Sequence, residues 1–361
     1  MTRERTKLEL LADGVRLSVG AVARLTATGH PLSVFEYPTT GGITICLPKV
    51  GYVNAPFHGP YAERARWTLD ANPDSGAFTL IKGDESIPVR PLPLPCYLGM
   101  LDSKGRRVDE VAMSHADRVR LSPLAGCAFR CTFCDFHQKD YFFHERVVEA
   151  LAIATGDTSL PPRHVLVSGG TPNARQSEML VDLVADLVGM TVLPVDFMYT
   201  PRHDTVDWVD RLIDGGIHGL SINLELFGIS ALKHHAPQKA AIGRDTFSAH
   251  IERAVERFGK PGRVRSLLIV GLEPLQDTID GVRWLCERGC QPALSPFRPA
   301  AGTPLETVAP PSLDLLTAAW EETREIAAYH GIAPAPTCVP CQNNCIAFPP
   351  EEWDWQLPGL P

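Results

Sequence analysis

From about Arg118 onward, short apolar runs alternate with longer stretches in which apolar residues recur every three or four positions. The short runs predict buried strands at 119–124, 165–168, 195–199, 219–226, 266–271 and 292–297. The longer stretches predict amphipathic helices at 145–155, 178–188, 206–213, 247–258 and 278–288. Alternating strands and helices indicate parallel βα units. Six such units predict an α/β fold with a partial (β/α)6 barrel of the TIM type.

The segments on either side of this alternation have a different pattern. An amphipathic helix is expected near residues 8–25 and a strand at 42–47, while prolines and glycines between 56 and 95 indicate turns and edge strands. A last helix at 313–329 precedes a tail rich in proline and tryptophan. We therefore expect an N-terminal α+β module at 1–115, the barrel at 116–310, and a C-terminal extension that binds a metal cluster at 311–361.

The charge balance narrows the class of partner. The chain has 34 basic and 42 acidic residues, a net charge of −8, which disfavours the broad phosphate-tracking surface of nucleic-acid binders. The N-terminus is charged, and no stretch approaches the roughly 18 apolar residues that a membrane span needs. We expect a cytoplasmic protein that acts on a small-molecule or carrier-bound substrate, with no nucleic-acid or membrane partner.

Six of the ten cysteines fall into two tight groups. In a chain without an export signal, such thiols are expected to bind metal or serve catalysis rather than form disulfides. The first group, Cys127, Cys131 and Cys134, follows the first predicted strand on one short loop, at the rim where barrel enzymes build their sites. Three thiolates leave one iron of a four-iron cluster open, whereas structural zinc normally takes four protein ligands.

The spacing of this loop resembles the signature of the radical S-adenosylmethionine superfamily. That signature has three cysteines separated by three and then two residues, with an aromatic residue, here Phe133, before the last cysteine. The resemblance implies a [4Fe–4S] cluster on these three thiolates, whose open iron binds S-adenosylmethionine. It also implies reductive cleavage of that cofactor to a 5′-deoxyadenosyl radical that abstracts a substrate hydrogen, an electron donor such as flavodoxin or ferredoxin, and a place for Phe133 in the adenine pocket. A zinc knuckle or a chance grouping is the alternative.

Further residues of the predicted barrel fit the same resemblance. By similarity, Gly169, Gly170 and Thr171 belong to a motif that accepts the cofactor's ammonium group, Asn223 and Glu225 reach its ribose or ammonium, and Gly271 belongs to a motif that packs against adenine. Arg298 closes the sixth predicted strand, and its guanidinium suits a carboxylate clamp. Plainer alternatives exist, because paired glycines end ordinary strands, polar residues fill barrel ends, and arginines form surface ion pairs. His137 and His144 follow the cysteine loop and are candidates for lining the site.

The second group of cysteines, Cys338, Cys341 and Cys345, lies beyond the predicted barrel. Its two-residue spacing suits both zinc and iron–sulfur ligation. A zinc site would need a fourth ligand, such as Cys96 or a histidine. The resemblance implies instead an auxiliary [4Fe–4S] cluster, because terminal cysteines usually bind one in that superfamily.

The reaction stays open between two enzymatic classes. The last predicted strands and the terminal cysteines resemble the branch that contains biotin-synthase-like proteins and two-component lipoyl synthases. A second cluster held by three thiolates can donate sulfide, which favours sulfur insertion into a small molecule or a carried acyl group. It can also bind substrate or pass electrons during dehydrogenation, epimerisation or rearrangement. A non-catalytic iron–sulfur or zinc-binding module is the third hypothesis.

Overall fold

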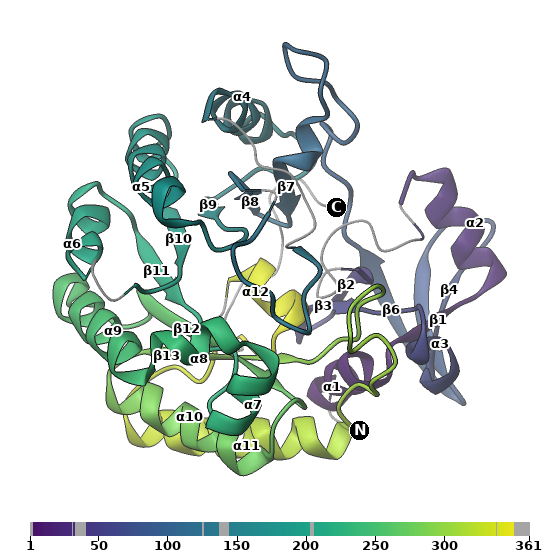
Figure 1. Ribbon diagram of the computed structural model, residues 1–361. Helices are drawn as coiled ribbons and strands as arrows, with labels where there is room; N and C mark the ends of the chain where they lie inside the picture. Colours follow the sequence, from purple (N-terminus) through teal and green to yellow (C-terminus); the bar gives the residue numbers. More distant parts are fainter. Residues whose placement is uncertain are drawn as a thin grey trace.

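The computed structural model describes residues 3–30, 32, 41–124, 126–136, 144–202, 206–336 and 338–349. Within this part of the chain, a seven-stranded sheet in the order β13-β12-β11-β10-β9-β8-β7 curls into an open half-barrel (Figure 1). A second sheet has six strands in the order β1-β4-β5-β6-β2-β3. The predicted α/β class with a partial barrel is confirmed.

The barrel sheet contains the six predicted parallel strands and one further strand. The parallel strands are β8 (Arg118–Leu121), β9 (His164–Val167), β10 (Val195–Tyr199), β11 (Gly219–Ile222), β12 (Val264–Val270) and β13 (Gln291–Pro296), and β7 (Ala112–His115) pairs antiparallel with β8 at the edge. The outer face bears the helices α4 (His144–Thr155), α5 (Ala174–Gly189), α6 (Asp207–Asp214), α9 (Arg244–Phe258) and α10 (Leu275–Glu287) (Figure 1). The five predicted helices are therefore confirmed, with ends shifted by a few residues.

Strand β8 shows how the sequence distinguishes the two faces of the barrel. Val119 and Leu121 are fully buried in the hydrophobic core, whereas Arg118 and Arg120 line a cavity inside the barrel. Successive side chains of a strand point to opposite faces, so this alternation puts the arginines on the inner face. The interior of the barrel is therefore charged along its first parallel strand.

The region after β11 departs from the prediction. The predicted strand 219–226 ends at Ile222, because the Asn223 side chain accepts hydrogen bonds from Ser221 Oγ (2.9 Å) and from the backbone N–H of Leu267 (3.2 Å), which competes with strand pairing. Glu225 then adopts a positive φ of 70°. Two short helices that the pattern did not predict follow, α7 (Ile229–His235) and α8 (Pro237–Ile242).

The N-terminal region is built on the six-stranded sheet. Its strands are β1 (Val15–Leu17), β2 (Ile43–Leu47), β3 (Gly51–Ala55), β4 (Trp67–Ala71), β5 (Phe78–Lys82) and β6 (Glu85–Pro91), and α3 (Pro60–Arg64) lies between β3 and β4. The predicted single helix near 8–25 is wrong, since α1 (Arg3–Asp13) and α2 (Val19–Ala27) are separate. Gly14 ends α1 at a φ of 72°, where a Cβ would overlap the carbonyl oxygen of Pro56, and Ser18 caps α2 by accepting from Ala21 N–H.

The two ends of the described chain pack against one another. Helix α1 contacts α11 (Leu313–Tyr329), and α12 (Val339–Asn344) contacts β3. Lys7 Nζ donates to the carbonyl of Ala347 at 2.6 Å, and the N–H of Ile346 donates to the carbonyl of Leu294 in β13 at 2.8 Å. The C-terminal segment is thereby held between the barrel sheet and the N-terminal region. Across the residues that the structure describes, no helix has the length and apolar character to cross a membrane.

Candidate functional site

A cavity of about 780 Å³ lies inside the barrel. Its lining comes from strands β7 to β10, β12 and β13, from the segment after β11, and from the loop that bears the first cysteine group. Much of the lining is aromatic or aliphatic, including Phe129, Phe133, Phe136, Phe197 and Leu267. A cavity of this size can hold a drug-sized ligand.

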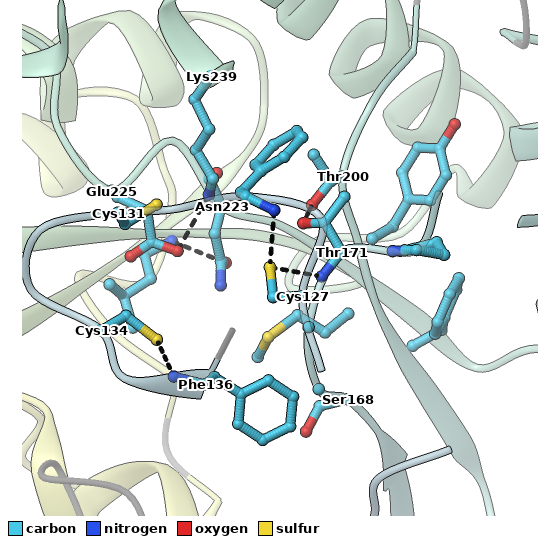
Figure 2. A pocket seen from close by; sticks show the side chains of 18 of the residues that line it. Cys127, Cys131, Cys134, Phe136, Ser168, Thr171, Thr200, Asn223, Glu225 and Lys239 are labelled. Carbon is cyan, nitrogen blue, oxygen red and sulfur yellow. Dashed lines mark hydrogen bonds and ion pairs between the residues drawn. The ribbon is translucent and has the colours of Figure 1, made fainter. Parts of the chain in front are cut away.

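The three cysteines of the loop all line this cavity. Figure 2 shows Cys127, Cys131 and Cys134 around its rim. Cys127 Sγ accepts from the backbone N–H groups of Thr171 at 3.1 Å and Phe129 at 3.3 Å, and Cys134 Sγ accepts from Phe136 N–H at 3.5 Å. Such hydrogen bonds favour thiolate over thiol and are the kind that tune iron–sulfur clusters.

Burial acts in the opposite direction on two of the three sulfurs, because it favours thiol over thiolate. It raises the pKa of Cys131 to about 12, against the nearby charge of Lys239, and raises the pKa of Cys134 to about 11. A thiolate in this setting therefore needs a bound cation to balance its charge. The donor set fits a cluster held by three thiolates. Over the residues described, no three His, Cys, Asp or Glu side chains are gathered closely enough to enclose a single ion.

The end of β9 packs directly against the cysteine loop. A Cβ on Gly170 would overlap the carbonyl oxygen of Gly126 and lie 2.7 Å from Cys127 Cβ, so only glycine fits there. Gly169 has a φ of 145° and faces Phe136. The carbonyl of Thr171 accepts from Ala128 N–H at 2.8 Å. Both predicted glycines and Thr171 thus lie at the cavity, beside the first cysteine.

Asn223 and Glu225 also line the cavity, joined by a lysine that the sequence analysis missed. Lys239 Nζ donates to the carbonyl of Asn223 at 2.7 Å and to Glu225 Oε1 at 3.1 Å, as Figure 2 shows. The lysine side chain is buried, so its charge is paired where water is scarce. Lys239 lies on α8, and no helix was expected there; Pro237 at the first turn was the available signal.

The remaining predicted residues divide between the cavity and the packing around it. Phe133 lines the cavity and packs against a hydrophobic cluster that includes Ile269 and Phe297. Gly271 is not among the described lining residues; at a φ of 107° it abuts Pro311 instead. His137, and the side chain of His144, lie outside the described part of the chain.

Arg298 lies in the cavity wall, and the surface ion pair weighed for it is wrong. The residue is 4% exposed, and its two terminal nitrogens donate to Asn54 Oδ1 at 2.7 Å and to the Asn54 carbonyl at 2.6 Å. Asn54 belongs to β3, so the guanidinium joins the barrel to the N-terminal sheet. Both contacts are to neutral oxygens.

In the second cysteine group, two of the three thiols that were expected to be free are joined in a disulfide. Cys338 and Cys341 form a disulfide at the start of α12, with their Cα atoms 5.4 Å apart, because the two-residue spacing brings them together at the first helical turn. Cys345 is a buried free thiol, 5% exposed. Burial raises the pKa of Cys345 to about 11, opposed by the charges of Lys7, Arg118 and Arg298. Arg118 Nη1 lies 3.6 Å from Cys341 Sγ.

Residues 121–285 match the family model of the radical SAM superfamily. The chain is 24% identical over 192 residues to bacteriochlorophyllide c C-7(1)-hydroxylase of Chlorobaculum limnaeum, covering 49% of this chain and 46% of that protein. It thus spans about half the length of the curated relative that it matches.

Solved structures give weaker likenesses. A radical SAM methyltransferase from Sphaerobacter thermophilus aligns at a TM-score of 0.49 and 17% identity, over 76% of this chain and 78% of the other. The FeFe-hydrogenase maturase HydG from Carboxydothermus hydrogenoformans aligns at 0.46 and 14%, over 59% and 52%. Residues 121–285, which include the cysteine loop and strands β9 to β12, thus form a radical SAM domain. Its relation to the biotin-synthase-like branch stays a prediction.

Proposed function

We propose that the protein is a radical SAM enzyme that abstracts hydrogen from a compact substrate bound inside the half-barrel. The observation that carries this proposal is one cavity lined by Cys127, Cys131 and Cys134 and by the polar residues that follow β9 and β11. When bound there, a [4Fe–4S] cluster would supply one electron to cleave S-adenosylmethionine to a 5′-deoxyadenosyl radical. A flavodoxin or ferredoxin is the proposed electron donor.

The residues around the cavity have separate roles in this proposal. The backbone N–H groups of Phe129, Thr171 and Phe136 hold negative charge on two of the sulfurs. Gly170 lets the β9 end lie against the loop, which leaves carbonyl groups near the cofactor's ammonium position. Lys239 fixes the Glu225 carboxylate at the cavity edge.

Four residues complete the proposed cofactor site. Phe133 offers an apolar ring for adenine. Gly169, Thr171 and Asn223 line the cavity beside the loop or after β11. Asn223 Oδ1 already accepts two hydrogen bonds, so the amide N–H groups are its remaining donors toward a ribose. Gly271 acts on this site only through its packing against Pro311.

The test is reductive cleavage of the cofactor. Protein reconstituted anaerobically with iron and sulfide, then reduced with dithionite, should form 5′-deoxyadenosine from S-adenosylmethionine, measured by chromatography and mass spectrometry. Iron bound without any 5′-deoxyadenosine would favour a non-catalytic module. A stoichiometric zinc ion on the loop, without iron, would refute the proposal.

Sulfur insertion is a second candidate, favoured by the extent of the cavity. Its wall includes Asn344, next to Cys345, and Arg118, which contacts Cys341. With the disulfide opened by reduction, Cys338, Cys341 and Cys345 would offer three thiolates to an auxiliary [4Fe–4S] cluster, and the buried cations around Cys345 fit such an anionic group. A substrate in the cavity would then lie between the two clusters.

Labelled sulfide separates sulfur insertion from the redox and isomerising reactions. Under sulfur insertion, protein reconstituted with ³⁴S sulfide should place the label in the product and stop near one turnover, since the donor cluster is dismantled. Many unlabelled turnovers would instead favour dehydrogenation, epimerisation, rearrangement or hydroxylation. The name of the Chlorobaculum limnaeum relative, a hydroxylase, belongs with that second outcome.

A further inference from the structure

The cavity is not confined to the interior of the barrel, because both faces of strand β10 line it. Successive side chains of a strand point to opposite faces, so Phe197 and Tyr199 share one face and Met198 takes the other. The ring of Tyr199 lies 6.4 Å from that of Trp208 on α6, so the face of Phe197 and Tyr199 is the one that the outer helices cover (Figure 1). The cavity therefore passes over the end of β10 and continues between the sheet and helices α5 and α6.

We call this part of the cavity the apolar branch. Its lining consists of Ser177, Leu180 and Val181 of α5, Phe197 and Tyr199 of β10, and Trp208 of α6, all at most 7% exposed. The two hydroxyl groups of the branch already have partners within the protein. Tyr199 OH lies 3.2 Å from His250 Nδ1, and Ser177 Oγ donates to the carbonyl of Asn173 at 2.8 Å. A polar ligand group would lose its water here and find these hydroxyls engaged, so the branch favours hydrocarbon.

The end of β10 brings the apolar branch close to the cysteine loop. Thr200 directly follows β10, and its Oγ1 lies 3.1 Å from Thr171 Oγ1. The N–H of Thr171 donates to Cys127 Sγ at 3.1 Å. Figure 2 shows Thr200 beside Thr171 and Cys127. A molecule that enters the branch over the end of β10 would therefore pass next to the first cysteine.

We propose that the apolar branch binds a hydrocarbon group of the substrate, an alkyl chain or an aromatic ring, while the carbon that loses hydrogen stays in the barrel beside the cysteine loop. This inference rests on the proposed function, since it names the substrate class of the same cavity. Binding is stabilised in proportion to the apolar area removed from water. With the hydrocarbon group held between the sheet and α5, the rest of the substrate has one orientation relative to the loop.

The experiment measures the binding of matched alcohols by calorimetry to anaerobically reconstituted protein with saturating S-adenosylmethionine. Affinity should rise about four-fold per methylene from 1-butanol through 1-hexanol to 1-octanol. The compound 1,6-hexanediol should bind at least about ten-fold more weakly than 1-hexanol, because its second hydroxyl would be buried without a hydrogen bond. The probes 2-phenylethanol and 1-octanol have equal numbers of carbons, so the tighter of the two shows whether a ring or a chain fits better.

Variants then assign the chain-length gain to the apolar branch. Val181→Phe and Leu180→Phe each fill the branch from α5, so 1-octanol should bind within about ten-fold of 1-butanol, against more than about 100-fold in wild type. Val188→Phe is the matched control, because Val188 lies two turns further along α5, packs against the same core and is not among the described residues that line this cavity. It should keep the wild-type series. Thermal unfolding checks that each variant is folded.

Three results would overturn the proposal. They are no gain with chain length in wild type, equal binding of 1-hexanol and 1,6-hexanediol, and the full gain in a folded Val181→Phe or Leu180→Phe protein. Iron content and 5′-deoxyadenosine formation are measured on the same samples. Cleavage of S-adenosylmethionine without a chain-length gain would refute this inference alone, whereas a gain without cleavage would refute the proposed function.

Discussion

The cysteine loop and helix α12 present the same reactive group near opposite ends of strand β8, in different surroundings. At the loop, Cys127 and Cys134 accept hydrogen bonds from backbone N–H groups, and the nearby Lys239 is already paired with Glu225. At α12, the charges of Lys7, Arg118 and Arg298 act on Cys345. Figure 1 shows α12 between the barrel sheet and strands β2 and β3.

Under the proposal of a cluster at each site, this difference predicts two clusters with different properties. Neutral backbone donors stabilise a thiolate without adding net charge, so they raise the potential of a cluster less than full positive charges do. Buried cations stabilise added negative charge, so a cluster at α12 should accept an electron at a higher potential. The loop therefore suits delivery of an electron, and the α12 site suits anchoring or acceptance.

The largest expected effect is loss of a cysteine from the loop. Cys131→Ala should lower 5′-deoxyadenosine formation by at least about 100-fold, since two thiolates hold an open-iron cluster poorly. Cys345→Ala should retain cofactor cleavage, because Cys345 lies outside the loop whose cluster is proposed to cleave the cofactor. The exposed Cys96 provides a matched control in Cys96→Ala. Wild-type cleavage by the Cys131 variant would exclude the loop as the cluster site.

The next effect concerns acid stability at the amino ends of the barrel strands, below the cavity. Burial, followed by the charge of Arg118, lowers the pKa of His164 to about 3. Between about pH 6.5 and 3 the unfolded chain therefore binds a proton that the folded chain does not, so acid removes stability. The free energy of unfolding of the iron-free protein should fall by about 3 kcal/mol between pH 6.5 and 4.

Asp196 extends this loss to lower pH. Although burial alone would raise its pKa, Arg265 and the hydrogen bond with His218 hold that pKa well below the usual range, so its stabilisation is lost below about pH 4. Urea unfolding at several pH values measures both effects. His164→Gln should flatten the dependence above pH 4, whereas His234→Gln, on an exposed face of α7, should leave it steep. Equal slopes for all three proteins would contradict the assignment.

The next prediction concerns iron content, which should fall two-fold when either cysteine group is removed. Reconstituted wild type should hold about eight irons and eight sulfides, two four-iron clusters. Replacing all three cysteines of either group by alanine should leave about four of each. Zinc with about four irons in wild type would show that α12 holds a different metal, and four irons without zinc would leave the disulfide as its working form.

The sequence predicted the barrel and the loop well because their signals are local. The strands and helices of the half-barrel follow from periodicity, and the spacing of Cys127, Cys131 and Cys134 lies within eight residues. Strand β8 also alternates Arg118 and Arg120 with apolar residues, a signal of two different faces that the sequence-based predictions did not use. Its meaning emerged only with the cavity around it.

Contacts between distant segments could not be predicted from local sequence patterns. Arg298 and Asn54 are 244 residues apart, and Lys7 meets Ala347 across 340 residues. Lys239 lies on a short helix with little periodicity, so neither its helix nor its pairing with Glu225 was predicted. The positive φ of Gly14 that divides the first helix depends on the close approach of Pro56.

The smallest effect on stability comes from Lys7, and it separates stability from redox tuning. Lys7 is fully buried, donates to the Ala347 carbonyl and lies 5.3 Å from the centre of the Phe348 ring. Since burying its charge costs about as much as these contacts return, Lys7→Met should change the free energy of unfolding of the iron-free protein by less than about 1 kcal/mol. Burial lowers the pKa of Lys7 to about 7, so its charge is present below that pH. There the potential of a cluster at α12 should nevertheless become more negative in the variant, because one nearby positive charge is lost. Redox titration followed by electron paramagnetic resonance measures this shift, and the signal of the loop cluster, identified by its response to S-adenosylmethionine, should stay in place.

Lys82→Met is the matched control, since Lys82 pairs with Glu9 rather than acting on Cys345. This variant should lower the free energy of unfolding and leave both cluster potentials unchanged. An unshifted α12 signal in Lys7→Met would show that the cations around Cys345 do not tune that site.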